Sequence, residues 1–109
     1  MQELAYKIKA DFFRALAHPV RLQIIEFLKS GENNVGSIMK ALSIQQSSLS
    51  RHLTVLREAG ILKSRQQGTV IYYNIEHHNI FHVLRPIADM LRKKLKKTEA
   101  VLSSLSKEK

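Results

Sequence analysis

The sequence of 109 residues contains no cysteine. Disulfide bonds, thiolate metal sites and thiol-based redox sensing are therefore excluded on chemical grounds. The sequence also lacks a Gly-rich phosphate loop and any pair of carboxylates flanked by an apolar pocket pattern, so no catalytic set can be assembled from it. We accordingly expect a protein that is not an enzyme and that uses no cofactor.

Long apolar runs are also absent. The first residues, MQELAYKIKADFF, carry charges within their apolar pattern, and no stretch approaches the length of a membrane span. These features predict a protein without a membrane partner and with a cytoplasmic location.

Acidic residues are scarce: nine Asp and Glu stand against 18 Lys and Arg, which gives a formal net charge of +9. This excess of positive charge favours a polyanionic partner and salt-sensitive binding. The alternative is that the positive net charge only keeps the protein soluble. The length is that of one domain, 1–109, whose modest core would benefit from a partner subunit.

Residues 36–60 show the pattern of two short helices joined by a tight turn at Ser43 and Ile44. Leu49, Leu53, Leu56 and Gly60 recur at helical spacing and predict a narrow buried stripe in the second helix. This is the signature of a helix-turn-helix over 36–59. An ordinary helical hairpin with a solvated polar face is the alternative.

The other side of that second helix is rich in small hydrogen-bonding side chains near its start. A helix that enters the major groove of DNA needs short donors and acceptors there, together with a cation for phosphate or guanine. Arg51 supplies the cation and is the strongest single candidate for a base or phosphate contact. The candidate DNA-binding residues of this helix are Gln45, Gln46, Ser47, Ser48, Ser50, Arg51 and Thr54.

After Gly60 the helical period ends. Two β-prone runs, 61–65 and 70–75, flank a polar loop at 66–69 that contains a glycine, which predicts a β-hairpin over 61–75. Its amide-rich and basic tip can reach the DNA backbone or minor groove, and the residues we expect there are Lys63, Arg65, Gln66 and Gln67. A helix-turn-helix followed by such a hairpin is the winged-helix arrangement.

Helical patterns also occupy both ends of the sequence. We predict a first helix at about 3–16, within the segment 1–16, and then a break at His18, with Pro19 opening a second, central helix. Val35 could contribute a short strand before the helix-turn-helix. A near-heptad pattern over 78–105 predicts a long last helix, which Pro86 either kinks or divides.

The apolar stripe of the last helix is too long for the domain core to cover. We therefore predict a homodimer through the first and last helices. The expected interface residues are Leu4, Ile8, Phe12, Ile80, Leu84, Ile87, Leu91, Leu95 and Leu102. The expected fold is mostly α with a β-hairpin: a winged helix-turn-helix of five to six helices and a two-stranded wing.

Three segments carry a resemblance to a known family: LAHPVRLQIIEFL, VGSIMKALSIQQSSLSRHLTVLREAGIL and KSRQQGTVIYYNI, in this order and spacing. They cover most of the chain, which resembles the ArsR/SmtB family of small dimeric winged-helix repressors. The resemblance implies repression by occupancy of an imperfect inverted repeat in double-stranded DNA. It implies base-reading positions at Gln46, Ser47, Ser48, Ser50, Arg51 and His52.

Many members of that family release DNA when a metal binds, through cysteines or through a set of carboxylate and histidine ligands on the last helices. The cysteine type is impossible here. An ungapped alignment places Lys93 at one ligand position of the other type, where an ammonium group opposes a cation. We therefore expect no metal site. A metal-responsive repressor with a rearranged site remains an alternative, with the candidate ligands His77, His78, His82 and Asp89.

An alternative from another class is a winged-helix module that docks an acidic protein. The polar helix face argues against it, since protein interfaces favour aromatic anchors and this face has none. The basic run at 92–97 is interpreted first as a solvated face of the last helix and second as a further nucleic-acid contact. The sequence does not identify an effector.

Overall fold

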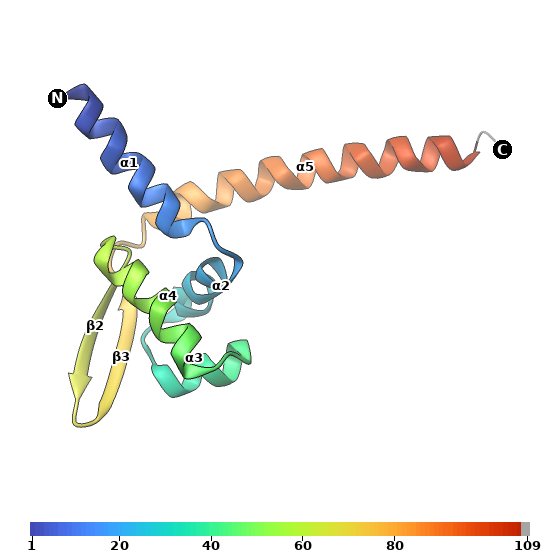
Figure 1. Ribbon diagram of the computed structural model, residues 1–109. Helices are drawn as coiled ribbons and strands as arrows, with labels where there is room; N and C mark the ends of the chain where they lie inside the picture. Colours follow the sequence, from blue (N-terminus) through green and yellow to red (C-terminus); the bar gives the residue numbers. More distant parts are fainter. Residues whose placement is uncertain (108–109) are drawn as a thin grey trace. The chain divides into compact units, whose positions relative to one another are not determined.

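The computed structural model describes residues 1–107, and it describes the side chains of residues 1–105. The residues form two compact units, Met1–His77 and the segment that begins at His78. The elements are α1 (Gln2–Leu16), α2 (Pro19–Phe27), a short 3-10 helix η1 (Leu28–Ser30), β1 (Asn33–Asn34), α3 (Val35–Leu42), α4 (Gln46–Glu58), β2 (Leu62–Gln67), β3 (Val70–Ile75) and α5 (Ile80–Lys107) (Figure 1).

The break between α1 and α2 follows the local chemistry of a histidine before a proline. His18 has extended backbone angles, φ −155° and ψ 134°, and its ring Nδ1 accepts the backbone N–H of Val20 at 3.1 Å. Pro19 then occupies the first turn of α2, where its missing N–H leaves no gap in the helix. The predicted break at this step is confirmed, and the side chain of His18 is the N-cap of α2.

The helix-turn-helix consists of α3 and α4. The side chain of Asn34 caps α3 by accepting the backbone N–H of Ser37 at 2.8 Å. At the other end of α3, Ser43 adopts the left-handed conformation with φ 52°, and the N–H of Ile44 reaches back to the carbonyl of Met39 at 3.2 Å. This reversal turns the chain directly into α4, as the sequence pattern predicted.

The core of the first unit lies where α2, α3, α4 and the base of the hairpin meet. Its fully buried side chains are Ile24, Ile25, Leu28, Ile38, Leu49, Leu53, Leu56, Leu62 and Ile75. The three leucines of the predicted stripe are therefore buried, whereas Gly60, its fourth predicted member, is exposed and lies beyond the end of α4. The helix ends in a Schellman pattern, in which Gly60 (φ 79°) donates its N–H to the carbonyl of Arg57 and Ile61 donates to that of Leu56.

The wing differs in detail from the expected hairpin. The sheet has three antiparallel strands in the order β1-β3-β2, because Asn33 and Asn34 pair with Tyr73 and Tyr72. Val35 therefore begins α3 and is not a strand residue. The hairpin loop is also shorter than predicted, since Gln67 still pairs with Val70 and only residues 68–69 connect the strands. A tight loop is possible because Gly68 has a positive φ of 64°.

The last helix, α5, has 28 residues and runs from Ile80 to Lys107 with Pro86 inside it. The helix continues through Pro86, so the alternative of two separate helices is wrong. It begins two residues after the start of the predicted segment 78–105. Within the described residues, no helix combines the length and the apolar character needed to cross a membrane.

Candidate nucleic-acid interface

The outer face of α4 is the principal candidate surface. Leu49, Leu53 and Leu56 are at most 1% exposed, and they fix the inner side of the helix against the core. The opposite side is open to solvent near the start of the helix. The exposed polar residues there are Gln45, Gln46, Ser47, Ser50 and Arg51. Burial of one side thus presents the other as a continuous hydrogen-bonding surface.

The N-terminus of α4 is also suited to an anion. Gln45 is the N-cap residue but makes no side-chain capping bond, and the first turn contains no acidic residue. The first backbone N–H groups of a helix have no partner within it, and the helix dipole favours negative charge at this end. This end of α4 can therefore receive a phosphate oxygen next to the exposed side chains.

Three of the residues predicted on α4 are less accessible than the others: Ser48, His52 and Thr54 are half-buried. The ring of His52 lies 4.3 Å from that of His18, measured between centroids. Its Nδ1 accepts a hydrogen bond from Nε of Arg21 at 3.1 Å. His52 is thus engaged with α2 through Nδ1, and its base-reading role stays a prediction.

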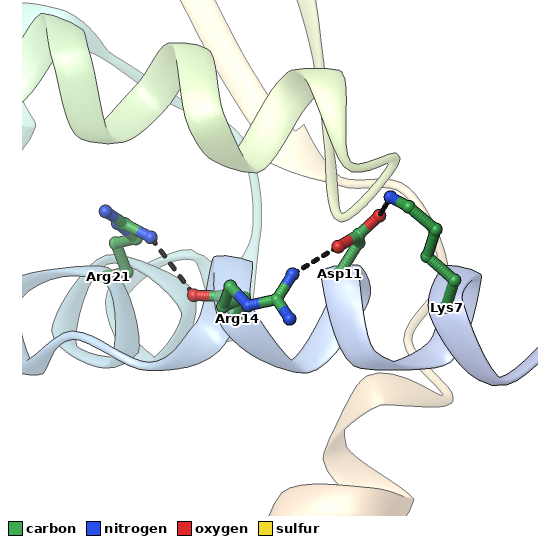
Figure 2. A network of polar contacts seen from close by, with 4 residues as sticks. All are labelled: Lys7, Asp11, Arg14 and Arg21. Atoms are coloured by element: carbon green, nitrogen blue, oxygen red, sulfur yellow. Dashed lines mark hydrogen bonds and ion pairs between the residues drawn. The ribbon is translucent and has the colours of Figure 1, made fainter.

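Arg21 connects this histidine to the end of α1. Its Nη1 donates to the carbonyl oxygens of Arg14 and Ala15 at 3.3 and 3.2 Å. Figure 2 shows the bond to Arg14, together with Asp11, which accepts hydrogen bonds from Lys7 and Arg14. Sequence reasoning missed Arg21. The available signal was its position in a mostly apolar helix, where a guanidinium needs partners.

The electrostatics at this junction disfavour a charged histidine. Burial lowers the pKa of His52, and electrostatic interactions with His18, Arg21 and Arg51 lower it further. Neutral His52 has a free lone pair on Nδ1, which is the form that can accept the bond from Arg21.

The wing presents its predicted residues on two faces. Lys63, Arg65 and Gln67 alternate with Gln66 along β2, and all four side chains are exposed. Gln66 donates to the carbonyl of Gly68 at 3.2 Å, within the hairpin tip. Arg65 is more tightly engaged, because it forms an ion pair with Glu32 at 2.7 Å. Glu32 was not among the residues predicted from sequence.

A groove of about 450 Å³ separates the helix-turn-helix from the wing. Gln46 and Ser50 line it from α4, and Val70 and Tyr72 line it from β3. The groove exists because β1 is only two residues long, so the beginning of β3 has no strand neighbour on that side. The α4 surface and the wing therefore lie on opposite sides of this groove.

The residues predicted for a dimer interface are mostly accessible. On α1, Leu4 and Ile8 are 55% and 59% exposed, and Phe12 is half-buried. On α5, Ile80 is buried and Leu84 half-buried. The remaining predicted residues of α5 are exposed: Ile87, Leu91, Leu95 and Leu102.

The four candidate metal ligands do not converge on a common point. Asp89 accepts a hydrogen bond from Arg92, and the ring of His78 lies 6.0 Å from that of Phe81. His77 and His82 are exposed. In the part of the chain that the structure describes, no three His, Cys, Asp or Glu side chains are grouped so as to hold a metal ion.

Comparison with known proteins agrees with this architecture. The profile of bacterial regulatory proteins of the arsR family matches residues 18–64. The HTH-type transcriptional regulator Rv0081 of Mycobacterium tuberculosis is 36% identical over 104 residues, which cover 94% of this chain and 91% of that protein. Its crystal structure superposes with a TM-score of 0.77, at 35% identity, over 86% of this chain and 95% of that one.

Two further solved structures are similar. The homodimeric winged helix-turn-helix DNA-binding domain Mb0332 of Mycobacterium bovis has a TM-score of 0.76 at 28% identity, over 85% of this chain and 89% of that one. The transcriptional repressor BigR of Xylella fastidiosa has a TM-score of 0.67 at 32% identity, over 79% and 91%. The chain therefore belongs to the arsR family of winged helix-turn-helix transcriptional regulators, and not to a family of enzymes.

Proposed function

We propose that this protein is a homodimeric repressor that binds an inverted-repeat operator in double-stranded DNA in the cytoplasm. The observation that carries the proposal is the exposed polar face of α4, held in place by a buried leucine stripe. Gln46, Ser47, Ser50 and Arg51 supply donors and acceptors of the sizes that reach base edges in the major groove. The net charge of +9 supplies the long-range attraction to DNA.

The proposed dimer follows from the apolar residues that remain accessible on α1 and α5. Large side chains such as Leu4, Ile8, Leu91 and Leu95 are each more than half exposed in the single chain. Covering them with a second copy would remove this apolar surface from water. A two-fold axis would then place two α4 helices in successive major grooves about 34–36 Å apart, which requires a (pseudo)palindromic operator. The homodimeric state of Mb0332 and the repressor activity named for BigR support this assignment.

The test is fluorescence anisotropy of the purified protein on a duplex from the region upstream of its own gene, compared with a scrambled duplex of equal length. We expect tight, salt-sensitive and sequence-selective binding, with two chains per duplex by analytical ultracentrifugation. Equal and weak binding to both duplexes would contradict the proposal and favour the protein-docking alternative. A parallel titration with zinc tests the expectation of no metal response, since release of the duplex by zinc would restore the metal-responsive alternative.

A further inference from the structure

One acidic residue is positioned directly against the basic surface of the wing. Glu32 immediately precedes β1, and Arg65 lies two strands away in β2. Tyr72 of β3 is the strand neighbour of Arg65, because it pairs with Arg65 of β2 on one side and with Asn34 of β1 on the other. The Arg65 guanidinium carbon is 4.3 Å from the centre of the Tyr72 ring. The arginine side chain therefore crosses the sheet to reach Glu32.

The contact between the two side chains is bidentate. Nε of Arg65 donates to Oε2 of Glu32 at 2.8 Å, and Nη2 donates to Oε1 at 2.7 Å. Nη1 donates to the side-chain oxygen of Gln67 at 3.0 Å. Three of the five N–H groups of the guanidinium are thus engaged within the protein, including the pair that gives two parallel hydrogen bonds.

A carboxylate and a phosphate compete for the same arginine geometry. Both accept two parallel N–H bonds from a guanidinium, and both are anions. The hydrogen bonds from Arg65 lower the pKa of the Glu32 carboxyl, so the group is charged at neutral pH. When a DNA phosphate approaches Arg65, the Nε and Nη2 groups that could bind it in bidentate fashion already donate to Glu32. The positive charge of the guanidinium is also already balanced by the carboxylate. The approach is open, since the Arg65 side chain is 51% exposed.

We propose that Glu32 is an intramolecular competitor of the DNA backbone for Arg65. In the free protein the Glu32 carboxylate holds the Arg65 side chain against the sheet. When the wing binds DNA, Arg65 must give up one or both of its hydrogen bonds to Glu32 in order to donate to a phosphate. This inference rests on the proposed function. Because a phosphate contact carries no sequence information, the competition weakens binding to every duplex by the same factor.

The test replaces Glu32 by its uncharged analogue and measures binding by anisotropy at several salt concentrations. We expect Glu32→Gln to tighten binding to operator and scrambled duplexes alike, with a gain that is larger at about 50 mM salt than at about 200 mM salt by about threefold for each protomer. The plot of log K against log salt concentration should steepen by about 0.9 for each protomer. Thermal unfolding of each variant checks that the fold is retained.

A double-mutant cycle separates this competition from a general effect of charge. In an Arg65→Gln background, Glu32→Gln should no longer change the affinity or the salt slope, because the arginine it would release is gone. Glu26→Gln removes the same charge from an exposed position of α2 and serves as the matched control. Two results would overturn the proposal: unchanged or weaker binding by Glu32→Gln, or a gain that persists without Arg65. Failure of the wild-type protein to bind any duplex would instead overturn the proposed function, and this role of Glu32 with it.

Discussion

The outer face of α4 and the wing each present an exposed arginine, but the two arginines are in different states. Within the described residues, the Arg51 side chain forms no hydrogen bond or ion pair, so all of its donors are open to a ligand. Arg65 has three of its donors engaged by Glu32 and Gln67. A basic side chain on a predicted binding surface therefore adds to affinity only as far as its donors are still available.

The two regions also differ in how they are held. The inner side of α4 is packed into the core through Leu49, Leu53 and Leu56. In β2, by contrast, only Leu62 is buried, and every residue from 63 to 67 is exposed. The position of α4 therefore depends on burial of apolar surface, whereas the outer part of the wing is held by strand pairing, since the exposed Glu32–Arg65 ion pair adds little stability.

Core truncation gives the largest expected effect and tests this difference in anchoring. Leu53→Ala removes a side chain that is 1% exposed and leaves a cavity behind α4, so we expect a loss of about 2–5 kcal/mol in the free energy of unfolding. Ile71→Ala in the wing truncates a side chain that is 38% exposed and should cost about 1 kcal/mol or less. Urea denaturation followed by circular dichroism measures both. Equal losses would show that the wing is anchored by burial as strongly as α4.

Removal of the unengaged arginine gives the next largest effect. Arg51→Ala should weaken binding to the operator by about 1–3 kcal/mol if Arg51 contacts a guanine, with a smaller effect on scrambled DNA. Anisotropy at constant salt provides the measurement. Arg57→Ala removes the same charge near the other end of α4 and is the matched control. An equal loss on both duplexes would mean that Arg51 only neutralises phosphate, and the guanine assignment would be wrong.

The fold could be predicted from the sequence where local pattern and burial agree. The leucine spacing of α4, the His18–Pro19 break and the β-prone residues of β3 each reflect a local preference that the core reinforces. The third strand could not be predicted, because two asparagines have a low strand propensity. They pair with Tyr72 and Tyr73, which are distant in sequence, and only that pairing makes them a strand.

The candidate site could be predicted in composition but not in the engagement of its side chains. The exposed polar residues at the start of α4 follow directly from the buried stripe opposite them. The partners of His52 and Arg65 lie 31 and 33 residues away in sequence, at Arg21 and Glu32. No periodicity connects such pairs, since they meet only after α2, α4 and the sheet have packed. Contacts of this kind decide which predicted residues remain free to bind.

The engaged histidine leads to the smallest expected effect, a pH dependence of stability. Burial, followed by electrostatic interactions with His18, Arg21 and Arg51, lowers the pKa of His52 from its ordinary value of 6.5. The folded protein therefore binds fewer protons at this site than the unfolded chain as the pH falls. The stability linked to His52 should be fully present above about pH 6.5 and should decrease as the pH falls toward the lowered pKa, by at most about 1.4 kcal/mol per pH unit.

A matched variant isolates this contribution from the other titrating groups near His52. His52→Gln keeps an oxygen that can accept the hydrogen bond from Arg21 but cannot be protonated in this range. Asp11 and Arg14 of α1, together with His18 and Arg21, are present in both proteins, so the difference between the two unfolding curves reports His52 alone. Asp11 and Glu32 both have a lowered pKa, because of their bonds to Lys7 and Arg65 respectively, and they affect stability only at lower pH. If the wild-type and His52→Gln proteins lost stability in parallel between about pH 7.5 and 5, the neutral, hydrogen-bonded state of His52 would not contribute to holding α4 against α2.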